Sequence, residues 1–210
     1  MKPRPPERHS TFYNLADALG RPGCALCRLT AKAVQDDLNA LLYENVNDPG
    51  ARRAMTDALG FCAAHAGLAA QLNDAFGIAI LYEALCREAA ARTGRGEQPA
   101  QRDCPACRVA RETGRRYADE FCGRLGETDL REKFLASDGF CLAHFQIVAQ
   151  RITDEAARAL VQSHQAATFR ALADQLAAFI KKHDYKQTAP FGPEADAWQR
   201  ALEKFAGRIQ

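Results

Sequence analysis

Hydrophobic residues in the first half of the chain recur at the spacing of helix faces. Between Leu26 and Val46 they fall three or four positions apart, close to the 3.6-residue period of an amphipathic helix. A turn follows, in which Pro49 disfavours helix at the residue before it and can begin the next helix. The helices predicted for this half run over 26–46, over 51–59, from about 62 to a break at 73–74, and from 76 to about 92.

The second half repeats this plan and adds two helices at its end. Alanine is abundant, β-branched residues are sparse, and no window alternates with the two-residue period of a strand. The predicted helices run over 106–125, near 129–136, from 142 to a break near 153–154, over about 154–183, and over 194–205. We therefore predict an all-α fold in which two pseudo-symmetric helical repeats pack into one body, with a long C-terminal helix and a short final helix.

The two halves also share a duplicated pattern of cysteine and histidine. Cys24 and Cys27 recur 80 positions later, and a Gly-Phe-Cys-x-x-His motif that contains Cys62 and His65 recurs 79 positions later. Each copy alone would have a marginal core, so we expect the two halves to pack together. The expected segments are a flexible N-terminal tail over 1–20, a first metal-binding repeat over 21–93, a linker over 94–103, a second metal-binding repeat over 104–186, and a C-terminal loop and amphipathic helix over 187–210.

Composition and charge exclude several classes of protein. The 210 residues are 47% hydrophobic, enough for a core, and the net charge of +2 gives no global electrostatic case for nucleic acid or an anionic membrane. No apolar segment approaches the ~20 residues of a membrane helix, and the basic, proline-rich start lacks the apolar stretch of an export signal. We therefore expect a cytoplasmic protein that binds no membrane and does not favour nucleic acid.

Eight cysteines in a reducing compartment favour metal ligands over disulfides. Cys86 and Cys122 lie outside the repeated pattern and are expected to be small buried apolar side chains. Each repeat supplies three thiolates and one imidazole, a standard structural zinc set that leaves no position for a catalytic water. The predicted ligands are Cys24, Cys27, Cys62 and His65 for one ion, and Cys104, Cys107, Cys141 and His144 for the other.

The spacing leaves alternatives open for both pairing and cofactor. An exchanged arrangement, with the Cys24/Cys27 pair facing Cys141 and His144, satisfies the same chemistry. Iron–sulfur clusters, one per repeat, are the alternative to two zinc ions, because cysteine-rich sets with an occasional histidine also hold clusters. A thiol oxidoreductase is a third possibility, although Cys104-Pro-Ala-Cys107 lacks the strand–helix–strand context of that class.

These patterns favour a non-enzymatic protein with two structural zinc ions that interacts with another protein. The alternative function is electron transfer or redox sensing through iron–sulfur clusters. The paired Cys-x-x-Cys and Gly-Phe-Cys-x-x-His motifs, with Leu42–Pro49 and Lys182–Tyr185 among the other matching stretches, resemble an uncharacterised bacterial family of all-helical proteins. The resemblance covers residues 22 to 207 and supports the segment limits and the eight ligands, but it implies no activity.

Overall fold

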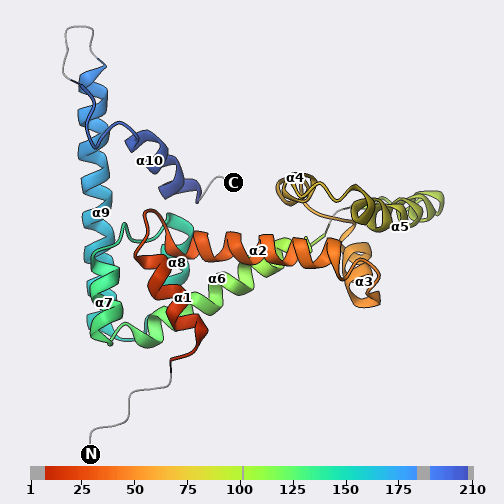
Figure 1. Cartoon of the computed structure of the whole chain (residues 1–210), viewed down its shortest axis with the longest axis horizontal. Coiled ribbons are helices and arrows are strands. Elements are labelled where there is room, and N and C mark those ends of the chain that lie inside the picture. Colours follow the sequence, from red (N-terminus) through yellow and green to blue (C-terminus); the bar gives the residue numbers. More distant parts are fainter. Residues whose placement is uncertain (1–7, 101, 184–189, 208–210) are drawn as a thin grey trace, which may run out of the picture. The chain divides into compact units, whose positions relative to one another are not determined.

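The computed structural model describes residues 8–100, 102–183 and 190–207, and every regular element within them is an α-helix (Figure 1). The all-α prediction is confirmed. The described helices are α1 (Ser10–Leu19), α2 (Ala25–Tyr43), α3 (Pro49–Ala58), α4 (Ala63–Gln71), α5 (Ala75–Gly94), α6 (Pro105–Arg124), α7 (Thr128–Leu135), α8 (Leu142–Ala149), α9 (Glu155–Lys182) and α10 (Ala197–Ala206). None of these helices has both the length and the apolar character needed to cross a bilayer.

The chain divides into two compact units that do not coincide with the two sequence repeats. The first unit contains the chain up to Leu29 together with the chain from Gly114 onward, and the second contains Thr30–Thr113. Both divisions fall inside helices: α2 begins in the first unit and ends in the second, whereas α6 begins in the second and ends in the first. Each unit therefore combines segments from both repeats.

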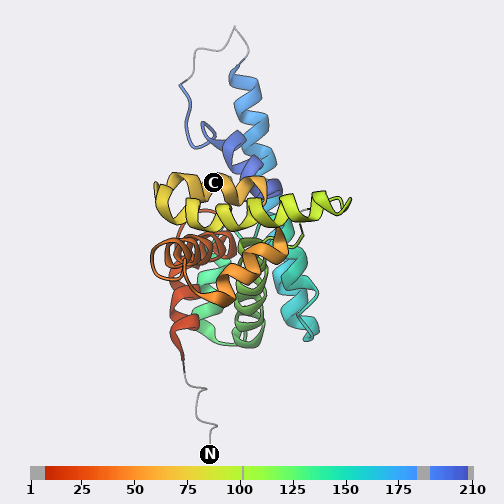
Figure 2. The same cartoon turned by 90° about the vertical axis from the view of Figure 1, so that its right-hand side faces the viewer.

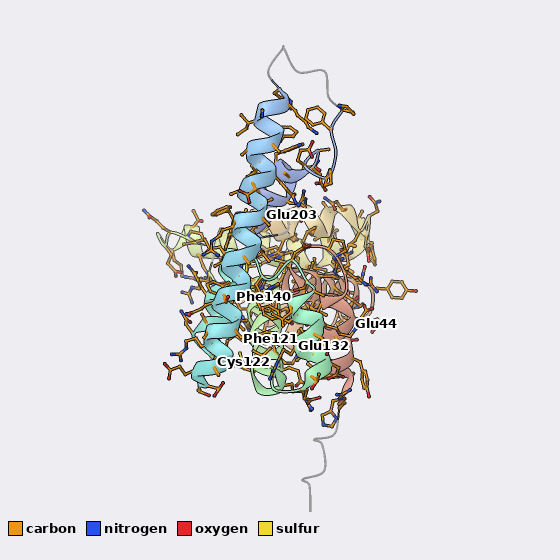
Figure 3. All side chains as sticks on the ribbon, turned by 90° about the vertical axis from the view of Figure 1, so that its left-hand side faces the viewer. Glu44, Phe121, Cys122, Glu132, Phe140 and Glu203 are labelled. Atoms are coloured by element: carbon orange, nitrogen blue, oxygen red, sulfur yellow. The ribbon has the colours of Figure 1, made fainter. Side chains whose placement is uncertain are left out.

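The core of the first unit is built around three phenylalanines. Phe121 of α6 lies with its ring centroid 5.0 Å from that of Phe134 and 5.0 Å from that of Phe140. All three side chains are fully buried, and Figure 3 shows Phe121 and Phe140 in the interior of this unit. Because Phe140 directly precedes Cys141, this cluster fixes the backbone that carries one of the candidate ligands.

An N-terminal helix corrects the expectation of a flexible tail through residue 20. α1 lies against α7 (Figure 1) and buries Phe12, Leu15 and Leu19 in the same core. These positions repeat at helical spacing, so burial of one apolar face explains why the segment is ordered. Residues 1–7 of the expected tail lie outside the described residues.

The second unit has a separate core in which α3 and α4 pack against α5 (Figure 2). Asp48 caps α3 by accepting a hydrogen bond from the backbone N–H of Ala51 at 2.8 Å, and Pro49 is the first helical residue. The predicted break before α5 is confirmed: Asn73 has φ of 56°, and Asp74 caps the new helix. The turn chemistry of the sequence thus sets these helix starts.

The two C-terminal helices follow the prediction with a shift at the last one. α9 begins after Asp154, whose carboxylate accepts a hydrogen bond from the backbone N–H of Ala157 at 2.7 Å. The final helix was expected from residue 194 but begins at Ala197, because 193–196 form a turn. α10 packs against both α9 and α8 (Figure 1), which brings the end of the chain to the helix that carries His144.

Candidate metal centres

The first centre is assembled at the starts of two helices in the first unit. Cys24 lies immediately before α2 and Cys27 lies in its first turn, while Cys141 is the N-cap of α8 and His144 lies one turn further. In both helices the spacing of three residues brings the two ligands to one side of the first turn. Four residues from two distant segments therefore converge on one point.

The ligand atoms of this first centre all lie within 4.8 Å of one another. Nδ1 of His144 lies 3.2 Å from Sγ of Cys141, 3.3 Å from Sγ of Cys27 and 3.6 Å from Sγ of Cys24. Sγ of Cys27 lies 3.5 Å from Sγ of Cys141. The side chains of Cys27 and Cys141 are buried, and the other two are partly exposed.

The second centre repeats this geometry within the second unit. Cys62 is the N-cap of α4 and His65 lies one turn into it, while Cys104 precedes α6 and Cys107 lies in its first turn. Nδ1 of His65 lies 3.2 Å from Sγ of Cys62, 3.3 Å from Sγ of Cys107 and 3.6 Å from Sγ of Cys104. Cys104 is the buried ligand here, and the other three are partly exposed.

These spacings suit four ligands of one ion. With metal–sulfur and metal–nitrogen bonds of ~2.3 and ~2.0–2.1 Å, a tetrahedral site places sulfur atoms about 3.8 Å apart and sulfur and nitrogen about 3.6 Å apart. The separations of 3.2–3.7 Å between these atoms come close to these values. All eight cysteines are free thiols, and 3.5 Å between Cys27 and Cys141 is well beyond a disulfide bond of ~2.05 Å.

The pairing of the ligand segments corrects the arrangement expected within each repeat. Cys24 and Cys27 meet Cys141 and His144, whereas Cys62 and His65 meet Cys104 and Cys107. The unit division accounts for this pairing, because α2 begins in the first unit and ends in the second, while α6 begins in the second and ends in the first. α2 therefore carries the chain out of the first unit before α4 begins, so the exchanged arrangement is the one adopted.

The thiols and histidines have mutually shifted pKa values. Hydrogen bonding with Cys141 and Cys27 holds the pKa of Cys24 well below its usual range, whereas hydrogen bonding with Cys141 and Cys24 raises the pKa of Cys27. Burial alone would lower the pKa of His144, but the thiols of Cys141 and Cys24 outweigh it and raise the pKa to about 9. The first centre thus favours a Cys24 thiolate beside a protonated His144. A metal ion that binds there displaces the remaining protons of the ligands.

In the second centre, burial and hydrogen bonding shift the pKa values in a different pattern. Burial raises the pKa of Cys107 to about 12 and lowers the pKa of His65. The pKa of Cys62 is lowered because the backbone amides of His65 and Ala64 and the thiols of Cys107 and Cys104 outweigh its burial. The lowered pKa values of His65 and Cys62 favour a neutral imidazole and a thiolate, which are the forms that bind a metal ion.

A glutamine that the sequence analysis did not identify holds the backbone beside the first centre. Gln165 of α9 is buried, accepts a hydrogen bond from the N–H of Phe140 at 2.9 Å, and donates one to the carbonyl of Phe140 at 2.9 Å. Gly139 has φ of 69°, and a Cβ there would lie 2.8 Å from Oε1 of Gln165. The glycine of the motif therefore allows the glutamine to approach the chain next to Cys141.

The first centre also borders a cavity of about 290 Å³. Its walls include Cys24, Cys27 and Cys141, together with Glu203 and Lys204 of α10. Lys204 donates a hydrogen bond to the carbonyl of Asp138, and the Asp138 carboxylate accepts one from the N–H of Gly23 at 2.7 Å. No periodic or motif signal in the sequence pointed to Lys204.

The residues around the second centre differ from those around the first. Gly60, the counterpart of Gly139, has φ of 91°, and a Cβ there would lie 3.4 Å from the hydroxyl of Tyr82. Asp103, which precedes Cys104, pairs with Arg111 at 2.6 Å on the surface. The glycine of the same motif thus faces a tyrosine in this unit and a glutamine in the other.

The two remaining cysteines lie apart from both centres. Cys122 packs against the core of the first unit, its Sγ lies 3.8 Å from the carbonyl of Val148, and burial raises its pKa to about 11. Cys86 is exposed, in contrast to the expectation of a buried side chain, because α5 buries the face that carries Gly77, Leu81 and Leu85.

The sequence profile of a family described as "Family of unknown function (DUF6062)" matches the chain twice, over residues 15–99 and 87–210. The protein belongs to this family. The two overlapping matches are consistent with the internal repeat, and the resemblance to an uncharacterised family is confirmed. No curated protein and no solved structure matches the chain.

Proposed function

We propose that the protein binds two structural zinc ions, one in each Cys3His centre, and acts as a non-enzymatic helical scaffold. The observation that carries this proposal is the convergence of three sulfur atoms and one Nδ1 atom, within 4.8 Å, in both centres. Four protein ligands complete the tetrahedral coordination that zinc prefers in structural sites. No coordination position remains for a catalytic water, which favours a structural role.

The close spacing of the donor atoms favours a single ion over an iron–sulfur cluster. The ligands of a cluster bind different iron atoms, so their donor atoms must be spaced more widely than those of a single ion. Separations of 3.2–3.7 Å are close to the tetrahedral values for one ion. The cluster protein remains the second candidate, because its electron-transfer or redox-sensing role requires the same residue types.

The proposed ions act as cross-links between helix starts. In the first unit the ion joins the start of α2 to the start of α8, two segments more than 100 residues apart in sequence. Closing such a loop has a modest entropic cost that grows slowly with its length, and structural zinc binds short peptides with apparent free energies of ~10–16 kcal/mol. Each ion therefore contributes substantially to the stability of its unit.

We also propose that the scaffold works by binding another protein in the cytoplasm. Support comes from the closed ligand sets and from the near balance of charge, with a net charge of +2. Affinity capture from cells with the native chain, followed by reconstitution from purified components, tests this role. Failure of every captured protein to bind the purified chain directly would contradict it.

Elemental analysis of anaerobically purified full-length protein tests the metal assignment. We expect two zinc atoms per chain and no absorbance near ~400 nm, where an iron–sulfur protein absorbs. Cys27→Ser and Cys107→Ser should each retain one zinc, while Cys86→Ser, at an exposed position apart from both centres, should retain two. Stoichiometric iron with a brown colour would favour the cluster protein, and protein without metal would contradict both candidates.

A further inference from the structure

The C-terminal helix lies directly over the first centre. α10 packs against α8, the helix that begins at Cys141 and carries His144, and against α9. Beyond its end, Gly207 approaches the centre so closely that a Cβ there would lie 3.7 Å from Sγ of Cys27. We call α10 together with Gly207 the cover.

The cover contributes a cation to the sulfur side of this centre. Lys204 lines the cavity that Cys24, Cys27 and Cys141 also line. Its ammonium donates to the carbonyl of Asp138, three residues before Cys141, and lies 3.5 Å from the position of a Cβ on Gly139. Lys204 therefore reaches the backbone that presents Cys141, and its side chain is partly buried.

The contact of Lys204 beside the first centre should depend on the ion, because the ion with its ligands is charged. One Zn²⁺ with three thiolates and a neutral imidazole has a net charge of −1. A cation beside such a centre is favoured in a partly buried environment, where the attraction is screened less than in water. Groups outside the ligand set that orient or neutralise it commonly alter metal affinity by 10–100-fold when mutated.

We propose that the cover is a metal-coupled closure of the first centre, held by Lys204 as a positioning residue, and that it slows the loss of the ion from this centre alone. The inference rests on the proposed function, because it requires an ion at Cys24, Cys27, Cys141 and His144. Binding of the ion and docking of α10 stabilise each other by linkage. An ion at the second centre has no such dependence.

The single tryptophan of the chain provides a direct probe, because Trp198 lies on α10 and is 47% exposed. Acrylamide quenching of its fluorescence in the zinc-loaded full chain therefore reports release of the cover. For Lys204→Met we expect up to about a twofold rise in the quenching constant, from partial to full exposure of the indole. Lys204→Arg should preserve the wild-type value, and so should Lys133→Met, a matched control on an exposed lysine of α7.

Metal release into a chromophoric chelator, measured on the same proteins, provides the second readout. Lys204→Met should speed the release of one of the two zinc ions about 10–100-fold and leave the other unchanged. The accelerated phase should persist in Lys204→Met combined with Cys107→Ser and be absent when it is combined with Cys27→Ser. Circular dichroism and zinc content before the chase show that the variants are folded and loaded.

The outcomes separate this inference from the proposed function. Two bound zinc ions with unchanged quenching and unchanged release in Lys204→Met would overturn the closure and leave the proposed function in place. Equal acceleration of both ions would overturn it as well, because the cover packs on the first centre within its own unit. A wild-type chain that binds no metal would overturn the proposed function, and with it the inference.

Discussion

The first centre lies beside the aromatic core of its unit, with two of its four ligands buried, whereas only Cys104 is buried in the second. The first is backed by the amide of Gln165 and bordered by Lys204, while the glycine before the second faces the hydroxyl of Tyr82. Identical ligands thus have surroundings of different polarity and enclosure. The comparison teaches that duplication of a ligand motif does not duplicate its supporting residues.

Removal of one buried ligand from each centre is expected to have the largest effect. Cys141→Ser and Cys104→Ser should each lose one metal equivalent and should destabilise mainly the unit that carries the lost ion. A loss of several kcal/mol is expected, below the apparent ~10–16 kcal/mol of zinc binding in peptides, because each unit also has its own core. Metal analysis with chelator-dependent thermal unfolding measures this, and loss of both ions from either variant would show that the centres are not independent.

Truncation of the phenylalanine before each N-cap cysteine compares the two cores. Phe140 is fully buried among aromatic rings and Phe61 is 5% exposed. Phe140→Ala should cost about 3–5 kcal/mol of unfolding free energy, and Phe61→Ala an amount at the lower end of that range. Denaturant unfolding of the zinc-loaded proteins provides the measurement. A larger loss for Phe61→Ala would reverse the comparison.

Substitution of the glycine in each motif tests how closely the supporting side chains approach. Both glycines have positive φ, so Gly139→Ala and Gly60→Ala should each cost about 1–3 kcal/mol. Gly139→Ala should cost more, because its Cβ would lie 2.8 Å from Gln165, compared with 3.4 Å from Tyr82 at Gly60. Combination with Gln165→Ala should reduce the added penalty of Gly139→Ala, and strict additivity in unfolding measurements would contradict the contact.

The smallest expected effect concerns an ion pair of the first unit that lies away from its centre. Lys182 and Glu194 approach to 2.5 Å, and together with the N–H of Gly192 this contact lowers the pKa of Glu194 to about 2. Since the folded pKa lies below the ordinary value of ~4.3, the stabilisation is present at neutral pH and is lost as the pH falls from about 4 toward 2.

Glu194→Gln should therefore lower stability slightly at pH 7 and approach the wild type at pH 2–3, when stability is compared across pH in chelator-treated proteins. Glu83→Gln, in an exposed pair with Arg87 of the second unit, serves as the control and should change stability less. A difference between Glu194→Gln and the wild type that stayed constant down to pH 2 would contradict the lowered pKa.

The helices and the ligand types could be predicted from the sequence because they depend on local spacing. Cys62 and Cys141 were expected at helix starts, and both are N-caps. The partners of each pair could not be deduced, because pairing depends on where α2 and α6 end in space. Local spacing is the same for pairing within a repeat and for the exchanged pairing, so it does not distinguish them.

Supporting residues were less accessible to sequence reasoning. Gln165 and Lys204 lie on helices far along the chain from the ligands that they support, and neither belongs to a repeated motif. α1 was missed for a different reason: its apolar positions, such as Phe12 and Leu15, are interspersed with polar residues in a segment next to a basic, proline-rich start. Only tertiary packing shows that this face is buried.

In the sequence, the second unit is inserted between the two segments of the first, and this order has a consequence for synthesis on the ribosome. The second unit is a continuous stretch, Thr30–Thr113, whereas the first needs residues from both ends of the chain. Compact segments fold as they emerge, beginning nearest the N-terminus. The proposed ion of the inserted unit can therefore bind before Cys141 is translated and joins Cys24 and Cys27, so the proposed function implies an early and a late metallation step.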